Sequence, residues 1–453
     1  HAMADTLNLP AMGADDDCFR CGGDSLDVII LISRLQQMGM DTSQAQLRLA
    51  STPRRLAMTE VQDTSMCIHS SSLESQWQYT TCCTGQPAAA SPVGCVFFTG
   101  ATGFLGSHLL CELLSRNRQL KVKCLVRCSS SVVGMQRISD SFRRYGLDPS
   151  LLSSTEVVCG DLSQPRFGIP AALYEQLAAE ATAVFHCAAT VNMLAHYEAL
   201  RGANVTGTRN VLDFCMTGIR KTLHYASTLS VFVSTDRNTG VASESDALVQ
   251  PTNIYGGYAQ TKFVAEKMVQ SVSPSDCDVF IYRYGLLCGD TQHAVSAPKD
   301  FLGMFFRGAR LVGTLPYDVS GTMALDVTPV DQASRVVADI VSANTPGIYH
   351  VASDNPLRYN QLCAILQEEG IIRGMEDYAH WKHTVGAFGE SAEAQALSMS
   401  LCRMDARQFA QMRYMDLFQA TRIRFDMTNT HGASPHRCMH NKELIQRYIR
   451  QSL

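Results

Sequence analysis

A tyrosine and a lysine stand four positions apart, in the run Tyr258-Ala-Gln-Thr-Lys262. On a helix this spacing puts the phenol and the ammonium on one face, one turn apart. A carbonyl carbon that accepts a hydride needs a proton at its oxygen. A free tyrosine has a pKa of about 10, and a nearby ammonium or nicotinamide charge is expected to lower it. The pair predicts carbonyl reduction, with Tyr258 at the oxygen and Lys262 also able to hold a nicotinamide ribose.

A glycine-rich turn upstream predicts the cofactor site. Residues Gly100–Gly106 read G-A-T-G-F-L-G and stand between a short apolar run and an amphipathic segment that extends through Leu114. Glycines allow a tight turn and a close approach of the backbone to a pyrophosphate. The first amides of the following helix then meet the phosphates. The candidate cofactor-binding residues of this turn are Gly100, Thr102, Gly103, Phe104, Leu105 and Gly106.

The residue after the next apolar run indicates which dinucleotide is bound. NAD sites usually place an acidic residue here, to bind the ribose 2′-hydroxyl, whereas this chain has Arg127. A guanidinium suits the additional 2′-phosphate of NADP. Arg137, ten positions farther on, could be a second clamp, and either arginine could instead be a solvated surface residue. We therefore expect NADPH as the reductant.

Strands that alternate with helices position these motifs. Apolar runs of strand length recur from Cys95 to about residue 290, separated by segments of helical pattern. This alternation predicts a parallel sheet covered by helices on both faces, the Rossmann type of α/β fold. Beyond about residue 290 the pattern becomes irregular and helical. The predicted strands lie at 95–99, 121–126, 156–159, 183–186, 222–226 and 278–282.

Composition excludes several classes of function. The formal net charge of -4 gives no basic field for nucleic acid or an anionic membrane. No apolar run has the length of a membrane span and no signal peptide precedes the motifs, so we expect a cytoplasmic protein without membrane contact. The 17 cysteines are mostly scattered singly, as is typical of reduced thiols. Cys18 and Cys21 form a lone C-x-x-C with no second ligand pair nearby, so no metal is expected.

The first 60 residues carry a separate motif. Asp15–Leu26 reads D-D-D-C-F-R-C-G-G-D-S-L and resembles the attachment site of peptidyl and acyl carrier domains. The resemblance implies that the Ser25 hydroxyl carries a 4′-phosphopantetheine arm, whose phosphodiester a helix N-terminus would favour. Alternatively, Asp24 and Ser25 only cap the helix. The helix that precedes this motif in the family is a stub in this chain, so a partial carrier domain is expected.

A strand end with three hydroxyl side chains precedes the tyrosine, where residues 226–231 read A-S-T-L-S-V. This segment resembles its counterpart in extended short-chain dehydrogenases. By that resemblance Thr228 supports Tyr258 and the substrate oxygen, with Ser227 and Ser230 as near competitors. The expected catalytic residues are Thr228, Tyr258 and Lys262.

Further segments resemble the cofactor contacts of the same dehydrogenases. Gly160–Leu162 follows the third strand, where that family places an adenine contact, and His186–Thr190 follows the fourth as a small-residue turn against the cofactor. Asn204 begins a helix, as it does in that family, and is expected to support the central strands. The resemblance adds four candidate cofactor-binding residues: Asp161, Leu162, Ala188 and Ala189.

The order of these motifs, across nearly the whole chain, resembles the terminal thioester reductase domains of nonribosomal peptide synthetases and polyketide–peptide hybrids. Aminoadipate reductase and carboxylic acid reductases share this layout. The resemblance implies a Rossmann domain followed by a smaller, mainly helical substrate domain. We expect a partial carrier domain at 4–60, a linker at 61–92, an NADP-binding Rossmann domain at 93–290 and a C-terminal substrate-binding region at 291–453, some of whose segments return to the Rossmann domain.

The resemblance also implies the reaction. NADPH would reduce the thioester of a carrier-bound peptidyl or polyketide chain, delivered by upstream modules of a megasynthase, and an aldehyde would leave. A second reduction to an alcohol could follow. Two alternatives remain open. Some relatives release the chain by Dieckmann cyclisation to a tetramic acid without net redox, and an extended short-chain dehydrogenase acting on a free small molecule would use the same three side chains.

Overall fold

The structure is a computed structural model of the chain. It describes residues 2–7, 9–23, 27, 31, 34–35, 38, 47, 50–58, 67–80, 94–192, 195–233, 235, 240–249, 253–297, 300–318, 321, 323–388, 391–401 and 423–453.

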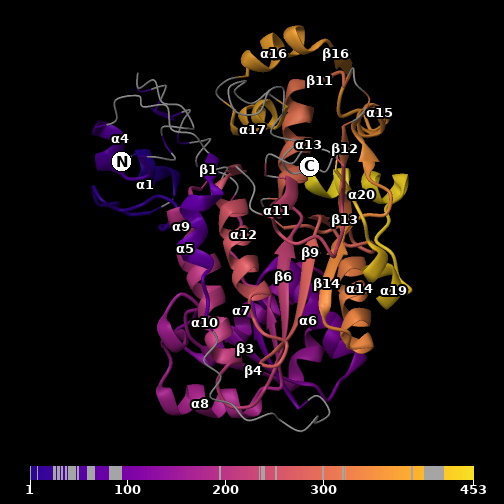
Figure 1. Ribbon diagram of the computed structural model, residues 1–453. Coiled ribbons are helices and arrows are strands. Elements are labelled where there is room, and N and C mark those ends of the chain that lie inside the picture. The colour runs from indigo at the N-terminus through magenta and orange to yellow at the C-terminus, as the bar shows by residue number, and fades with distance from the viewer. Residues whose placement is uncertain are drawn as a thin grey trace.

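A seven-stranded parallel sheet lies at the centre of the molecule, in the order β14-β9-β6-β5-β2-β3-β4 (Figure 1). The strand order reverses direction between β2 and β5. At such a switch point the loops at the carboxyl ends of the strands separate and leave room for a ligand. The strands are β2 (Cys95–Thr99), β3 (Lys121–Val126), β4 (Thr155–Cys159), β5 (Ala183–His186), β6 (Thr222–Thr228), β9 (Asp278–Tyr284) and β14 (Gly347–Val351).

Helices cover both faces of this sheet, as predicted. Successive side chains of a strand point to opposite faces, so Phe97 of β2 enters one apolar cluster and Phe98 enters the other. The first cluster lies under α8 (Ala171–Glu180), α10 (Gly207–Cys215) and α12 (Gly257–Gln270). The second lies under α6 (Phe104–Arg116), α7 (Ser131–Arg144) and α14 (Val330–Ala343).

Several short helices lie in the segments that connect the strands of the central sheet. They are η2 (Pro149–Ser154), η3 (Pro165–Gly168), α9 (Tyr197–Arg201), η4 (Gly202–Thr206) and α11 (Ser230–Val233).

Strand β14 departs from the pattern expected beyond residue 290. It lies beside β9 in the central sheet, with Ile348 opposite Ile281. The segment reads G-I-Y-H-V, and its histidine, His350, is fully buried. A histidine is usually found at least partly exposed, which explains why the sequence pattern did not indicate a core strand.

The C-terminal part has its own apolar core, made largely by helices (Figure 1). Trp381 and Tyr448 are among its fully buried side chains. Its helices are α13 (Phe301–Val312), α15 (Tyr359–Glu368), α16 (Tyr378–Gly386), α17 (Ala392–Leu401) and α20 (Lys442–Ser452), and its short strands are β10 (Leu286–Cys288), β11 (Thr314–Pro316), β12 (Ala324–Leu325), β13 (Val327–Pro329), β15 (Leu357–Arg358) and β16 (Gly374–Glu376).

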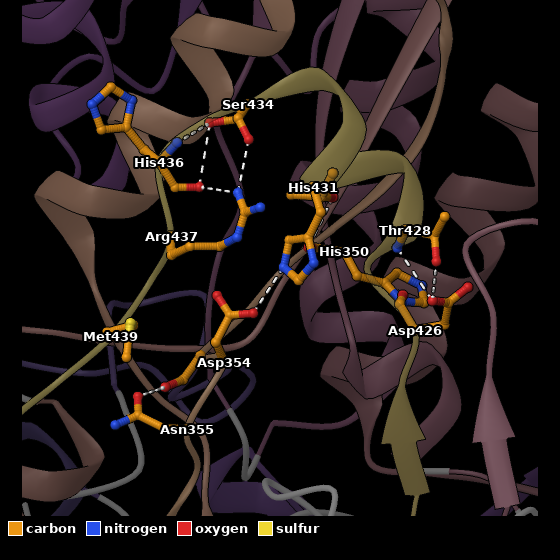
Figure 2. Close-up of polar contacts among 12 residues, drawn as sticks. His350, Asp354, Asn355, Asp426, Thr428, His431, Ser434, His436, Arg437 and Met439 are labelled. Atoms are coloured by element: carbon orange, nitrogen blue, oxygen red, sulfur yellow. Dashed lines mark hydrogen bonds and ion pairs between the residues drawn. The ribbon is translucent and has the colours of Figure 1, made fainter.

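Polar contacts join the last segment of the chain to the central sheet. Strand β17 (Ile423–Phe425) pairs with β7 (Gly240–Ala242), and α19 (Thr428–Ala433) follows it. Figure 2 shows His431 facing Asp354, at 2.8 Å, just beyond the end of β14. The buried carboxylate of Glu244 accepts hydrogen bonds from the backbone of both His350 and Thr430.

Part of the predicted linker has regular structure. Strand β1 (Cys67–His69) pairs antiparallel with β8 (Asn253–Tyr255), and η1 (Ser70–Leu73) and α5 (Glu74–Trp77) follow. Trp77 lies edge-on to Phe263 of α12, with ring centroids 5.8 Å apart. Leu73 and Trp77 are apolar residues at helical spacing within an otherwise polar stretch. A single pair is too short to show as a periodic pattern in the sequence. The N-terminal segment, residues 2–58, includes α1 (Ala2–Thr6) and α4 (Pro53–Met58).

Candidate active site

Thr228 and Tyr258 meet at the carboxyl end of the central sheet. Thr228 is the last residue of β6 and Tyr258 lies in the first turn of α12. The Thr228 side chain lies close enough to Tyr258 to lower the pKa of its phenol, and the Thr228 hydroxyl donates to the Ser230 hydroxyl at 3.1 Å. Gly257 allows the helix to begin here, because a Cβ atom at this position would collide with the carbonyl of Ala195.

The structure separates the three hydroxyl side chains that the sequence left as competitors. Ser227 donates a hydrogen bond to the buried carboxylate of Glu266, on the helix side of the sheet. Ser230 accepts from Thr228. Of the three, Thr228 is the one that contacts Tyr258.

Lys262 lies one turn after Tyr258 and is almost fully buried. Its ammonium donates to the phenol oxygen of Tyr225 at 2.7 Å and to the carbonyl of Ala226 at 2.6 Å. Burial, which disfavours the charged form, lowers the pKa of Lys262 to about 7, against the opposing effect of Glu266. Because an ammonium has three N–H donors, one remains beyond these two contacts.

The expectation that Lys262 lowers the pKa of Tyr258 is wrong for this structure. Burial raises the pKa of Tyr258 to about 12, and the neighbouring Thr228 side chain opposes that shift only in part. The ammonium contacts Tyr225 instead. Tyr258 therefore keeps its proton at neutral pH and has it available to donate.

The glycine turn has the geometry of a phosphate-binding loop. Gly100 has a φ of +88°, and a Cβ atom there would lie 2.6 Å from the amide nitrogen of Ala188. A Cβ atom on Gly106 would collide with the carbonyl of Gly100. Gly103 is the N-cap of α6 and has no side chain to accept from the first turn. The amides of that turn are left for an outside acceptor such as a pyrophosphate, so this site fits a dinucleotide.

The two arginines share one corner beyond β3. Arg127 directly follows the strand, and Arg137 of α7 donates to the carbonyl of Arg127 at 2.5 Å. Both side chains are exposed. Asp161 follows the neighbouring strand β4 and accepts from the amide of Ser163 at 2.9 Å. The sheet thus brings Arg127 and Asp161 to adjacent strand ends, and Arg137 reaches Arg127 from α7.

The other predicted cofactor residues differ in exposure. Ala188 adjoins Gly100, as the expected small-residue turn requires, and Ala189 is exposed. Leu162 packs toward Gly207 of α10 and contributes to the core. Asn204 accepts from the amide of Thr190 at 2.7 Å and donates to Thr261 of α12 at 3.0 Å, so it joins the turn after β5 to the catalytic helix.

A buried ion pair behind the site was missed from the sequence. Glu266, one turn after Lys262 on α12, contacts Arg283 of β9 through two nitrogens at 2.8 and 2.7 Å, and both side chains are fully buried. Glu266 follows Lys262 at the same spacing at which Lys262 follows Tyr258. This helical spacing was the signal in the sequence that could have indicated Glu266. The partner on β9 could not be read from spacing.

The N-terminal segment contacts the rim of the site through polar groups. The Ser51 hydroxyl donates to Asp17 at 2.5 Å and lies 3.3 Å from the imidazole Nε2 of His196. The side chain of Asn192 donates to the carbonyl of Gly23 at 3.1 Å. Ser25 itself lies outside the described residues.

An apolar cluster reinforces the same contact. Met3 and Phe19 of the N-terminal segment pack with Ala195 and Leu200, which follow β5. Tyr258 is partly buried against this cluster. The described residues of the N-terminal segment therefore pack beside Tyr258, and Figure 1 shows α1 close to α9.

Within the described ranges, no group of three or more His, Cys, Asp or Glu side chains is arranged to hold a metal ion. No helix in the part of the chain that the structure describes is both long enough and apolar enough to cross a membrane.

Two protein families match parts of this chain. Residues 98–337 match the NAD-binding family described as male sterility protein. The chain belongs to this family. Residues 1–58 match the phosphopantetheine attachment site family. The male sterility family match covers the glycine turn from Phe98 onward and all three predicted catalytic residues.

Curated relatives of this male sterility family member include two reductases. The chain is 30% identical over 376 residues to aldehyde reductase lnaA of Aspergillus flavus, covering 78% of this chain and 36% of that protein. It is 30% identical to the L-2-aminoadipate reductase large subunit of Penicillium chrysogenum, covering 66% of this chain and 22% of that protein. The chain thus spans about a third or less of the length of these relatives.

Solved structures place the family member among terminal reductase domains. The terminal R domain from the myxalamid PKS-NRPS biosynthetic pathway is 28% identical, with a TM-score of 0.74 over 84% of this chain and 97% of that one. A thiolation-reductase di-domain from an archaeal non-ribosomal peptide synthetase, 19% identical, shares the fold with a TM-score of 0.71 over 99% of this chain and 95% of that one. The recognition of a terminal reductase domain preceded by a carrier segment is confirmed.

Proposed function

We propose that this chain reduces a carrier-bound acyl or peptidyl thioester with NADPH and releases an aldehyde. One observation carries the proposal. Thr228 and Tyr258 lie side by side, with Lys262 one turn away, at the sheet edge that bears the glycine turn, and the N-terminal segment packs against that rim. A hydride donor, a proton donor and a thioester carrier would therefore converge on one place.

In the proposed reaction the bound cofactor supplies a hydride to the thioester carbonyl carbon. Tyr258 gives its proton to the carbonyl oxygen, and the Thr228 hydroxyl orients that phenol. Lys262 would hold the nicotinamide ribose with the N–H that remains beyond its contacts with Tyr225 and Ala226. The resulting hemithioacetal collapses to an aldehyde and the free pantetheine thiol.

We further propose that the carrier residues are Ser25 and its surroundings, and that the partners are upstream modules of a peptide or polyketide–peptide synthetase. The contacts of Gly23 with Asn192 and of Asp17 and Ser51 with His196 support this, because they hold the attachment motif beside the reductase. We also propose four regions along the chain. The carrier segment comprises residues 4–60, the connecting segment 61–92, the cofactor-binding domain 93–290 and the substrate-binding region 291–453.

Product analysis tests the reaction. The full chain would be offered a panel of pantetheine thioesters with and without NADPH, and products identified by mass spectrometry. An aldehyde or alcohol that forms only with NADPH is expected. A tetramic acid formed without NADPH would instead establish Dieckmann release, and turnover of free small carbonyls but no thioester would establish an ordinary dehydrogenase.

Arg127→Ala is expected to raise the Kd for NADPH by about 10- to 100-fold and to leave the Kd for NADH nearly unchanged. A hydrogen bond to a charged group contributes about 1.5–3 kcal/mol, and every 1.4 kcal/mol is about tenfold in affinity. Fluorescence titration of both cofactors measures this. Arg143→Ala, an exposed arginine on the same helix as Arg137 that pairs with Asp140, is the control. Equal losses for NADH and NADPH would contradict a 2′-phosphate contact.

A further inference from the structure

Buried polar contacts lie on both sides of the Tyr225 ring, between the strand before the glycine turn and Lys262. Thr99, the last residue of β2, lies 2.8 Å from His186 Nδ1, and His186 Nε2 lies 3.1 Å from the hydroxyl of Thr208. The ring centroid of Tyr225 lies 5.6 Å from that of His186, and the Tyr225 phenol oxygen accepts from Lys262 at 2.7 Å. Each of these five side chains is at most 3% exposed.

Counting protons fixes the direction of the hydrogen bonds of His186. The Thr208 hydroxyl gives its only proton to the carbonyl of Asn204, at 2.7 Å, so it must accept from His186. His186 is neutral, because burial lowers its pKa to about 3. Its proton is then on Nε2, and Nδ1 accepts from Thr99. His186 therefore adds no charge beside Tyr225, and the Lys262 ammonium, which has only donors, meets a lone pair of the Tyr225 oxygen.

We propose that Tyr225 is the positioning residue of Lys262, and that its phenol oxygen holds the ammonium against strand β6. The proposal rests on the function proposed for Lys262. The Lys262 ammonium also lies 4.2 Å from the centroid of the Tyr225 ring. Tyr225 and the carbonyl of Ala226 together occupy two of the three N–H donors and leave one for the nicotinamide ribose.

Several neighbouring groups affect the pKa of the Lys262 ammonium. Glu266 on the same helix and Cys187 after β5 both favour the charged ammonium, and burial opposes it. The Lys262 charge in turn disfavours protonation of His186. Tyr225 stays a neutral phenol, because burial raises its pKa well above the ordinary value. Loss of the Tyr225 oxygen therefore removes an acceptor of the ammonium without removing a charge.

Tyr225→Phe tests the proposal in the full chain, with NADPH binding as the readout. Wild-type affinity is expected to fall as the pH rises above about 7, where Lys262 loses its proton. In the variant the same fall is expected about one pH unit lower, since the loss of a hydrogen bond to a charged group corresponds to about tenfold or more. The 2′-phosphate, which titrates near pH 6, affects both proteins alike and cancels in the comparison.

Two further variants keep the result decisive. Tyr282→Phe removes a buried phenol oxygen that is hydrogen-bonded to His224, and it is expected to leave the profile in place. Tyr225→His, which keeps a ring with an acceptor nitrogen, is expected to shift the profile less than Tyr225→Phe, and its shift decides the matter if Tyr225→Phe does not fold. Superimposable profiles, or an equal shift in Tyr282→Phe, would overturn the proposal. Binding does not require turnover, so a chain that fails to reduce thioesters still gives an answer.

Discussion

Tyr258→Phe is expected to lower the reduction of a soluble pantetheine thioester by about a hundred- to ten-thousandfold, while NADPH affinity stays within about twofold of wild type. The substitution removes the proton that we propose Tyr258 gives to the carbonyl oxygen, and it keeps the ring that packs against the Ala195 cluster. The pKa of Tyr258, raised to about 12 by burial, means that the phenol is fully protonated before hydride transfer. Steady-state oxidation of NADPH, followed by absorbance, measures the loss.

The loss should fall on kcat, because the proton is transferred only as charge develops on the oxygen. Tyr197→Phe is a matched control, since Tyr197 packs beside the same loop and its buried hydroxyl has no hydrogen-bond partner among the described residues. It is expected to retain near wild-type turnover. If Tyr258→Phe turned over at the wild-type rate, Tyr258 would have no part in proton transfer, although the fold and the cofactor site would be unaffected.

Arg283→Met is expected to lower the free energy of unfolding by about 3–5 kcal/mol. Arg283 and Glu266 are both fully buried and joined by two short contacts, so removal of the guanidinium leaves a carboxylate without its countercharge in the core. Arg283 also lies 3.2 Å from Nε2 of His350 on β14, and one substitution therefore loosens three elements. Urea denaturation followed by circular dichroism measures the change.

The double variant Glu266→Gln/Arg283→Met separates the charge from the packing. With the uncompensated carboxylate replaced by an amide, we expect it to recover a substantial part of the stability that the single variant loses, as a coupled pair should. Glu266→Gln alone should also destabilise, because it leaves the guanidinium buried without a carboxylate. A loss below about 1 kcal/mol in Arg283→Met would mean that water reaches this position and that the pair is not buried in solution.

Local motifs explain why much of the site was predictable. A glycine turn acts through backbone geometry set within seven residues, and the φ of Gly100 and the contact of its Cβ position with Ala188 agree with what the sequence required. The spacing of Tyr258 and Lys262 is a property of one helix. The six strands read from the sequence all appear in the central sheet, because buried parallel strands need continuous apolar runs.

The expectations that failed depended on partners distant in sequence. The predicted effect of Lys262 on Tyr258 assumed that neighbours on a helix face contact each other, whereas the ammonium turns toward Tyr225, 37 positions away. Strand β14 was not recognised because its buried histidine is satisfied by Arg283 and by the backbone of Asp426. Trp77 packs on α12 from within a polar stretch.

The sequence by itself determined the family, the parallel α/β sheet, the glycine turn and the identity of Tyr258 and Lys262, because each is encoded by residues close together along the chain. Only the tertiary structure decided that Thr228 rather than Ser227 meets the tyrosine, that Glu266 pairs with Arg283, and that Tyr225 receives the lysine. The physical reason is burial. Once a polar group leaves water it must find a partner across the core, and which partner is near depends on how separate strands and helices come together.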